Sequence, residues 1–425
     1  MKTVLEPGVG IKTGFRDLRF NPDNLTSFLV SVVFSLSGAV VIFINVAAKA
    51  NFTQAQAVSW ICSAFVISGI ISALLDLYYK VPLLGMPTLT GMLVMGPVLK
   101  LFTVPEVVAG YIIAGVVFAL LGLSGLLGKY AKYLPLPIVM GMIAGVFMSY
   151  GTAIVTSIQA LPLIGILTVA AFLITPQISK KIPAQAVSLV VAVVLTLILI
   201  PIEGKAGLFG VTVPIFVAPS FNPNVILSIA LPLVLVSIAD LLKCYGVLKA
   251  NGYEPPINSM VFWPSGIGSI LGAVFLSPTL SMTGPITAIV SDPAAGPLQS
   301  RYVGAFLKAL SAIAIGLCAG FLVPFLMKLP AGVTSVLAGL AMIGLFTSSL
   351  SVAFGSKKFT IGAFTAFIVA LANLNLAGIS AAVWALLFGV IVSALLERPH
   401  FKTLYSSFTP TPAASTAPAS PTVPK

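Results

Sequence analysis

Long apolar runs alternate with short polar segments along almost the whole chain. Many of these runs reach the roughly 20 residues that a helix needs to cross the hydrocarbon core of a bilayer. The pattern predicts fourteen membrane-spanning helices in two sets of seven. The first set is expected at 26–48, 56–78, 83–103, 106–128, 136–156, 160–176 and 184–203. The second set, with a short third member, is expected at 225–247, 258–276, 283–293, 302–327, 331–352, 359–375 and 379–396.

Composition supports this prediction and excludes other classes of protein. Of the 425 residues, 58% are hydrophobic and only 8% are charged, whereas a soluble domain carries about 25% charged residues. We therefore predict an all-α polytopic membrane protein. The single histidine, His400, follows the last apolar run, and the three cysteines lie in separate predicted spans without the close spacing of a metal or redox site. No metal, no cofactor and no enzymatic activity is expected.

The positive charges indicate how the chain is oriented, because cytoplasmic loops collect lysine and arginine. With a cytoplasmic N-terminus, 17 of the 22 lysines and arginines lie in cytoplasmic loops and tails, and only Lys49, Lys100, Lys205 and Lys328 lie outside. We predict that both termini are cytoplasmic and that the protein lies in the lipid bilayer of the inner (plasma) membrane. The formal net charge of +12 then reflects topology and implies no nucleic acid partner.

Short stretches of the first half recur in the second half. Residues 87–90 recur as 278–281 at an offset of 191, and several residues of 69–74 recur in 266–271 at an offset of 197. The matching stretches lie in helices of equal rank within the two sets. An odd number of helices per copy makes the two copies inverted, as in many transporters. The fold is thus predicted to be a seven-plus-seven inverted repeat.

This repeat divides the chain into five predicted segments. They are a cytoplasmic N-terminus at 1–24, a first repeat at 25–204, an extracytoplasmic linker at 205–224, a second repeat at 225–398 and a cytoplasmic tail at 399–425. The tail is rich in proline, serine, threonine and alanine from residue 406 onward, so it is expected to be disordered.

Two spans are interrupted at matching positions of the two copies. Residues 81–91 and 277–285 combine prolines and glycines with hydroxyl side chains, which breaks a regular helix. Irregular backbone at membrane depth is tolerated only where it is buried in protein or lines a cavity, and paired breaks in transporters mark the substrate site. The alternative is a pair of proline kinks that aid packing. The predicted substrate-binding residues here are Thr88, Leu89, Thr90, Ser281, Met282, Thr283 and Gly284.

Two polar residues within other spans are further candidates. Asp240 lies well inside the eighth span, where a carboxylate is costly and therefore points to function, so it is the candidate for proton coupling. Its alternative role is an ion pair with Lys243 three residues further on. Asn45, late in the first span, faces either the substrate or another helix, and we include it among the predicted substrate-binding residues.

The loops resemble those of a known family, the benzoate/proton symporters. The likeness is carried most specifically by residues 247–253 with Pro255 and Pro256, and also by residues 79–82 and 329–330. It covers about 25–398 and implies the inverted-repeat fold shared with uracil and other nucleobase symporters. That fold has a core domain of spans 1–4 and 8–11 and a gate domain of spans 5–7 and 12–14. Related folds often dimerise, so a homodimer is a candidate assembly.

The leading functional hypothesis is a proton-coupled symporter for a small aromatic carboxylate such as benzoate. The two half-helix N-termini would hold the substrate carboxylate, and Asp240 would carry the proton. One alternative is a nucleobase symporter, in which Asp240 accepts a hydrogen bond from a ring N–H. The other is an uncoupled anion transporter or channel of the same fold, in which Asp240 is only paired with Lys243.

Overall fold

A computed structural model describes residues 5–10, 18, 20–127, 135–179, 183–200, 212–374, 376 and 380–401. The predicted cytoplasmic tail beyond 401, half of the predicted N-terminal segment and residues 205–211 of the predicted linker lie outside the described residues.

The first half of the chain opens with one long interrupted helix. It runs as α1 (Pro22–Phe34), a π-helical turn η2 (Ser35–Val40) and α2 (Val41–Lys49). It begins where it does because Asn21 and Asn24 cap each other's backbone, with the Asn21 side chain accepting from the Asn24 N–H at 2.7 Å. The elements that follow are α3 (Gln54–Tyr79), β1 (Gly85–Pro87), α4 (Leu89–Met95), η3 (Leu99–Leu101), α5 (Val104–Ser124), α7 (Leu136–Ala160), α8 (Pro162–Ile178) and α9 (Ala184–Leu199).

The second half repeats this order with local differences. A π-helical turn η5 (Ile226–Ala230) leads into α10 (Leu231–Ala250), and α11 (Ile257–Met260), η6 (Val261–Gly268) and α12 (Ser269–Ala273) form the next continuous helix. Then come β2 (Leu280–Met282), α13 (Gly284–Ser291), η7 (Pro293–Ala295), η8 (Leu298–Ser300), α14 (Arg301–Leu317), α15 (Ala319–Met327), α16 (Ala331–Phe354), α17 (Thr360–Leu371) and α18 (Ala381–Leu396).

Among the described residues, seven helices are long and apolar enough to cross a membrane. Four shorter apolar helices, α8, α9, α17 and α18, have 10–17 residues. The run expected as one helix at 302–327 is divided at Cys318, which separates α14 from α15. The Thr212 hydroxyl accepts from the Gly320 N–H at 2.7 Å, so the second helix starts with its first turn bonded to another segment. A mostly helical membrane protein is therefore confirmed, and the count of fourteen spans stays a prediction.

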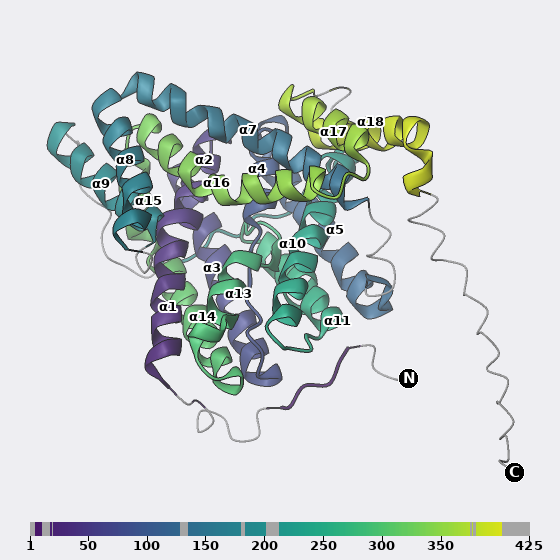
Figure 1. Cartoon of the computed structure of the whole chain (residues 1–425), viewed down its shortest axis with the longest axis horizontal. Coiled ribbons are helices and arrows are strands. Elements are labelled where there is room, and N and C mark those ends of the chain that lie inside the picture. The colour runs from purple at the N-terminus through teal and green to yellow at the C-terminus, as the bar shows by residue number, and fades with distance from the viewer. Residues whose placement is uncertain are drawn as a thin grey trace, which may run out of the picture.

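The helices form two layers. In Figure 1, α7, α8, α9, α16, α17 and α18 lie across the top, and we call them the upper layer. Below them lie α3, α10, α11, α13 and α14. We group these with α1, α2, α4, α5, α12 and α15, which pack on them, as the lower layer. Within the layers, α7 packs on α16 and α17, and α3 packs on α14. Small residues allow the close approach: a Cβ added at Gly69 of α3 would lie 2.6 Å from the Ala309 carbonyl oxygen of α14.

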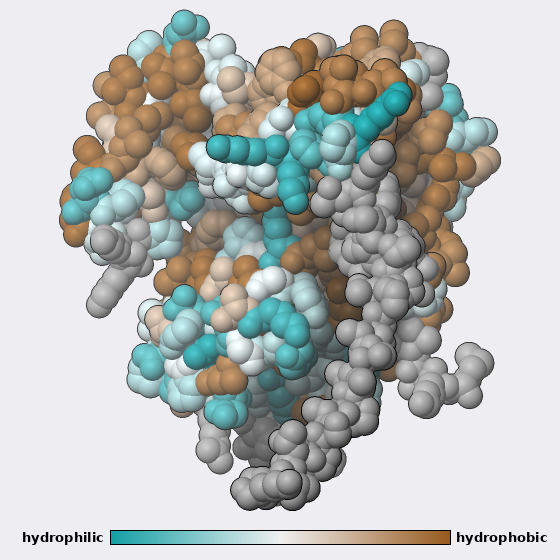
Figure 2. Space-filling view, turned by 45° about the vertical axis from the view of Figure 1, so that its right-hand side comes forward, coloured by the Kyte–Doolittle hydropathy of each residue, from teal (hydrophilic) through white to brown (hydrophobic). Residues whose placement is uncertain are grey.

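The upper layer carries much of the exposed apolar surface. Figure 2 shows hydrophobic side chains over its outer parts, whereas polar side chains gather on the lower part of that view. Large exposed apolar residues on α8, α9 and α18 include Leu163, Ile198 and Leu395. Such a surface suits contact with lipid chains.

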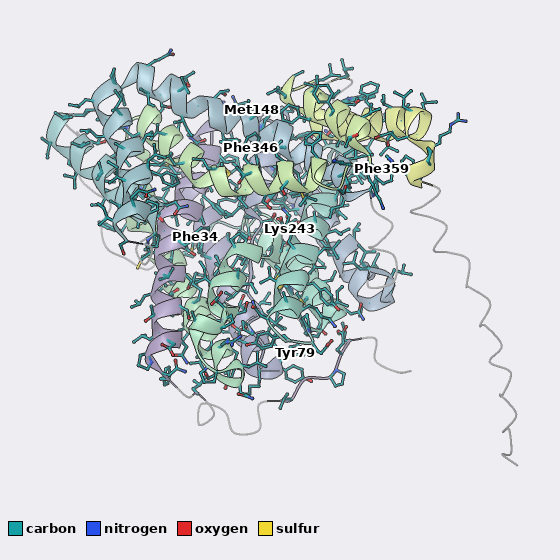
Figure 3. All side chains as sticks on the ribbon, viewed as in Figure 1. Phe34, Tyr79, Met148, Lys243, Phe346 and Phe359 are labelled. Carbon is teal, nitrogen blue, oxygen red and sulfur yellow. The ribbon has the colours of Figure 1, made fainter. Side chains whose placement is uncertain are left out.

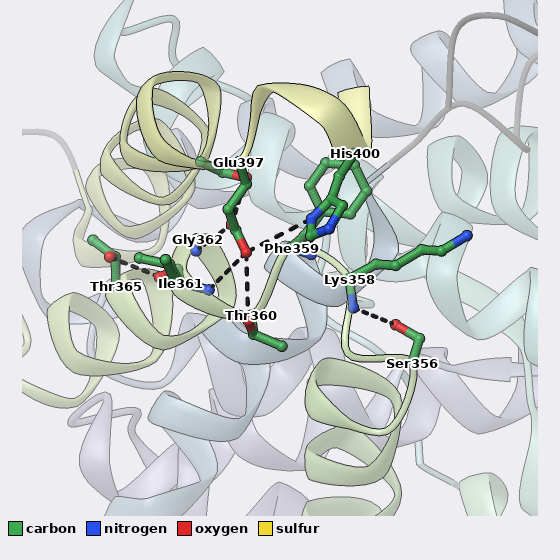
Figure 4. Close-up of polar contacts among 10 residues, drawn as sticks. Ser356, Lys358, Phe359, Thr360, Ile361, Gly362, Thr365, Glu397 and His400 are labelled. Carbon is green, nitrogen blue, oxygen red and sulfur yellow. Dashed lines mark hydrogen bonds and ion pairs between the residues drawn. The ribbon is translucent and has the colours of Figure 1, made fainter. Parts of the chain in front are cut away.

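One carboxylate joins the two helices at the end of the upper layer (Figure 4). Glu397, only 5% exposed, follows α18 and accepts from the backbone N–H groups of Ile361 at 3.1 Å and Gly362 at 3.0 Å, in the first turn of α17. Ser393 donates to the same carboxylate at 2.8 Å. Burial alone would raise the pKa of Glu397, but these hydrogen bonds to its charged form lower the pKa below its ordinary value.

Candidate functional site

The two interrupted spans meet in the interior of the protein, where every residue of β1 and β2 is buried. Strands β1 and β2 pair in antiparallel fashion, with Met86 opposite Ser281. Two further backbone bonds extend the pairing, from the Thr88 N–H to the Thr279 carbonyl and from the Thr283 N–H to the Leu84 carbonyl, each at 3.1 Å. The backbone N–H and C=O groups in the non-helical part of each span thus find hydrogen-bond partners in the non-helical part of the other span.

Each strand is also held by a serine of the preceding helix. The Ser72 hydroxyl of α3 accepts from the Gly85 N–H and donates to the Gly85 carbonyl, both at 3.0 Å. In the second copy, the Ser269 hydroxyl of α12 accepts from the Leu280 N–H at 2.8 Å. We call these two serines the strand clamps. Their matching positions agree with the repetition seen in the sequence.

A short helix follows each of the two strands. Thr88 caps α4, because its hydroxyl accepts from the Gly91 N–H at 3.0 Å. Pro285 stands in the first turn of α13, where the missing N–H costs nothing. Each break therefore ends at the N-terminus of a short helix, and the first residues of both helices face the same cavity.

A cavity of about 680 Å³ opens at this place, between the two layers. Its walls come from both breaks, from α10, and from the upper-layer helices α9 and α16. Figure 3 shows Lys243 and Phe34 where the layers face each other. The lining residues are Phe34, Pro87, Thr88, Leu89, Thr90, Gln185, Asp240, Lys243, Gly246, Val247, Ala250, Ser281, Met282, Thr283, Gly284, Pro285, Ala288, Ala341, Gly344, Leu345 and Ser348.

The structure brings together eight of the nine residues named from the sequence. They are Thr88, Leu89, Thr90, Asp240, Ser281, Met282, Thr283 and Gly284. Asn45 does not line this cavity. Its amide nitrogen donates to the Ser335 hydroxyl at 3.1 Å, so it joins α2 of the lower layer to α16 of the upper layer.

Asp240 lies among hydroxyl donors in the cavity wall. Thr88 and Thr90 donate to its two carboxylate oxygens at 3.2 Å and 3.3 Å. Lys243, one turn further along α10, makes no ion pair with Asp240 within 4.0 Å in the described part of the chain, although its charge acts on the carboxylate through space. The carboxylate and the ammonium group therefore both remain turned to the cavity without being joined.

The cavity also holds residues that the sequence did not single out. The sequence pattern pointed to Lys243 only as a partner of Asp240, and it did not place Gln185, Gly344 and Ser348 of the upper layer at a site. The polar Gln185 at the start of the apolar α9 was the one available signal. The other residues line a cavity only because of the way in which the two layers dock. No local pattern in the sequence encodes that docking.

The described residues contain no cluster of three or more His, Cys, Asp or Glu side chains that could hold a metal ion. The chemistry that the cavity offers is non-covalent: one ammonium group, one carboxylate, several hydroxyls and apolar walls. It suits the binding of a small molecule with a charged end and an apolar body.

The sequence profile of the benzoate membrane transport protein family, BenE, matches residues 19–395. The chain belongs to this family. Among BenE relatives, the benzoate membrane transport protein of Acinetobacter baylyi is 26% identical over 372 residues, which cover 87% of this chain and 94% of the relative. The inner membrane protein YdcO of Escherichia coli is 24% identical over 391 residues, which cover 89% and 98%. The predicted resemblance to benzoate transporters, and the prediction of a membrane transporter, are confirmed.

Solved structures share the fold of this BenE chain. The transmembrane domain of the cyanobacterial bicarbonate transporter BicA superposes with a TM-score of 0.60 at 18% identity, covering 90% of this chain and 99% of that one. The structure of SLC26A9 superposes with a TM-score of 0.62 at 15% identity, covering 90% and 66%. The BenE chain thus has the fold of these membrane transporters.

Proposed function

We propose that this BenE protein imports a small aromatic carboxylate such as benzoate together with a proton. The observation that carries the proposal is the composition of the cavity between the two breaks. It combines one ammonium group, Lys243, with apolar walls from both layers and a hydroxyl-bonded carboxylate, Asp240.

The substrate would lie with its two ends in different surroundings. Its carboxylate is drawn to the Lys243 ammonium group and to the start of α13, since Gly284 lies against the Lys243 side chain. Its ring packs between Phe34, Leu89 and Met282. A volume of about 680 Å³ falls within the roughly 300–1,000 Å³ that is typical of small-molecule sites.

Asp240 would carry the coupled proton. A substrate anion and an ionised Asp240 in one cavity repel each other, so binding of the anion favours protonation of the carboxylate. Thr88 and Thr90 can bond to the carboxyl group in either state, because each hydroxyl both donates and accepts. Substrate and proton would therefore enter and leave the cavity together.

The transport cycle we propose moves the two layers against each other. The upper layer would be the gate domain and the lower layer the core domain of a fourteen-span inverted repeat with both termini cytoplasmic. The cavity reaches Gly246 and Ala250 near the end of α10, on the predicted cytoplasmic side, which supports an inward-open state. The Asn45–Ser335 hydrogen bond then belongs to the closed outer side.

Uptake into proteoliposomes tests this proposal. With an inside-alkaline pH gradient, labelled benzoate should accumulate above the level in protein-free liposomes, which corrects for diffusion of the uncharged acid. A protonophore should abolish the accumulation. Equilibration without accumulation would instead support the uncoupled anion transporter, and uptake of uracil but not benzoate would support the nucleobase symporter.

A further inference from the structure

A second, smaller cavity of about 190 Å³ lies at another point where the two layers meet. It is lined by Lys49, Gly96, Pro97, Lys100, Tyr150 and Asn373. Lys49 and Lys100 belong to the lower layer, and Tyr150 and Asn373 belong to the upper layer. The two lysines are among the four basic residues that the charge pattern places on the extracytoplasmic side.

The two ammonium groups in this cavity have no counter-ion among the residues that the structure describes. Neither Lys49 nor Lys100 forms an ion pair within the described part of the chain, and no carboxylate lines the cavity there. Their charges are close enough to act on each other. The Lys49 ammonium group lies 3.8 Å from the centre of the Tyr150 ring, a cation–π contact that only partly offsets the repulsion.

Tyr150 contributes a buried hydroxyl group to this cavity, and this group also lacks a hydrogen-bond partner among the described residues. Its side chain is only 2% exposed, and its hydroxyl has no hydrogen-bond partner among the described residues. The hydroxyl lies beside Gly96, where an added Cβ would be 2.9 Å from the oxygen. A buried hydroxyl without a partner is costly, and a ligand oxygen in this cavity would remove that cost.

We propose that this cavity is an outer capture site for small carboxylate anions, in which the two ammonium groups and the Tyr150 hydroxyl hold the carboxylate. The role of this site rests on the proposed function: the site would receive the substrate anion before the anion reaches the central cavity. Because 190 Å³ is below the roughly 300 Å³ of an ordinary ligand pocket, it takes the carboxylate end and leaves the ring partly outside. The anion would bridge the two layers at the place where they must part for the outer side to open.

Protection of the lysines from an amine-reactive reagent tests the site directly. The full-length protein is labelled in detergent, and the extent of labelling at Lys49, Lys100 and Lys328 is measured by mass spectrometry with increasing benzoate. Benzoate should protect Lys49 and Lys100 and leave Lys328, on the same predicted side, unchanged. Benzamide, which has the same shape without the charge, should protect neither. Tyr150→Phe should raise the half-protecting concentration roughly 3- to 10-fold, the effect of one hydrogen bond.

A Lys243→Gln variant separates this site from the central cavity. The protection should persist in that variant, because Lys243 lines only the larger cavity. Loss of protection in Lys243→Gln would show that benzoate acts from the centre and would overturn the outer site. Absence of protection by benzoate in the wild-type protein would overturn it as well. Protection without any benzoate transport would leave the outer site standing and refute the proposed function instead.

Discussion

At the scale of single residues, the buried polar groups are of two kinds. Those at the central cavity, Asp240 with Thr88 and Thr90, are bonded to one another and turned to a space that a ligand can enter. Lys308 of α14 differs: it is fully buried, and its ammonium group has no partner among the described residues. The first kind supports function, whereas the second costs stability.

Replacing Lys308 by methionine should therefore stabilise the protein. Methionine keeps the unbranched shape and removes a buried amino group without a partner, which costs about 1–3 kcal/mol. The thermal midpoint of Lys308→Met in detergent should rise above that of the wild type, with Lys328→Met as a half-exposed control that changes little. A lower midpoint for Lys308→Met would mean that the ammonium group has a stabilising partner.

The surroundings of Glu397 predict that the stability of the folded protein depends on pH. Its pKa is lowered in the folded protein, mainly because the N–H groups of Gly362 and Ile361 outweigh the effect of burial. The contribution of Glu397 to the free energy of unfolding is therefore complete above its pKa in the unfolded chain. It is lost as the pH falls through its pKa in the folded protein. Glu397→Gln should cost roughly 1 kcal/mol at pH 7, as for a lost helix cap, and clearly less at pH 4. Equal losses at both pH values, measured by thermal unfolding, would contradict the role of the charge.

At the scale of elements, the interruptions could be predicted and their pairing could not. Prolines and glycines at 81–91 and 277–285 show that neither segment is a regular helix. The pairing of β1 with β2 joins strands of three residues that lie almost 200 positions apart, so no local alternation of apolar and polar residues marks it. Likewise Asn45 was a visible polar residue, but only the docking of α2 on α16 determines that it meets Ser335.

The strand clamps should matter more than other buried serines. Ser72→Ala leaves the Gly85 N–H and carbonyl without the hydroxyl that bonds both, and Ser269→Ala does so for the Leu280 N–H. Each change should cost about 1–3 kcal/mol and raise the KM for benzoate, because the strands lead directly into the cavity wall. Ser349→Ala is the matched control, since that buried serine donates to Leu345 of its own helix and to no other group in the described part of the chain. Thermal unfolding and initial uptake rates that are the same in all three variants would rule out a special role for the clamps.

At the scale of the whole molecule, the amount of apolar sequence and the asymmetry of positive charge were enough to predict a polytopic membrane protein and its orientation. The inverted repetition, the paired breaks and the family resemblance added the prediction of a transporter. The division into two layers was implied only by the family resemblance, because layer contacts such as α7 on α16 depend on small residues spread over the helices. The central cavity lies between these layers, and its upper-layer wall is the part that sequence reasoning missed. We therefore propose that coupling of substrate to proton is a property of the assembled layers with Asp240 between them.

The most direct test of this coupling is the behaviour of Asp240→Asn in proteoliposomes. Asparagine keeps the size and the hydrogen-bonding oxygen that Thr88 and Thr90 can use, but it cannot take up a proton. We expect that the variant still exchanges labelled for unlabelled benzoate at close to the wild-type rate. Its accumulation of benzoate under an inside-alkaline pH gradient should fall to the level of protein-free liposomes. An Asp240→Asn protein that still concentrates benzoate in response to the gradient would contradict the account, because the proton would then be carried by another group.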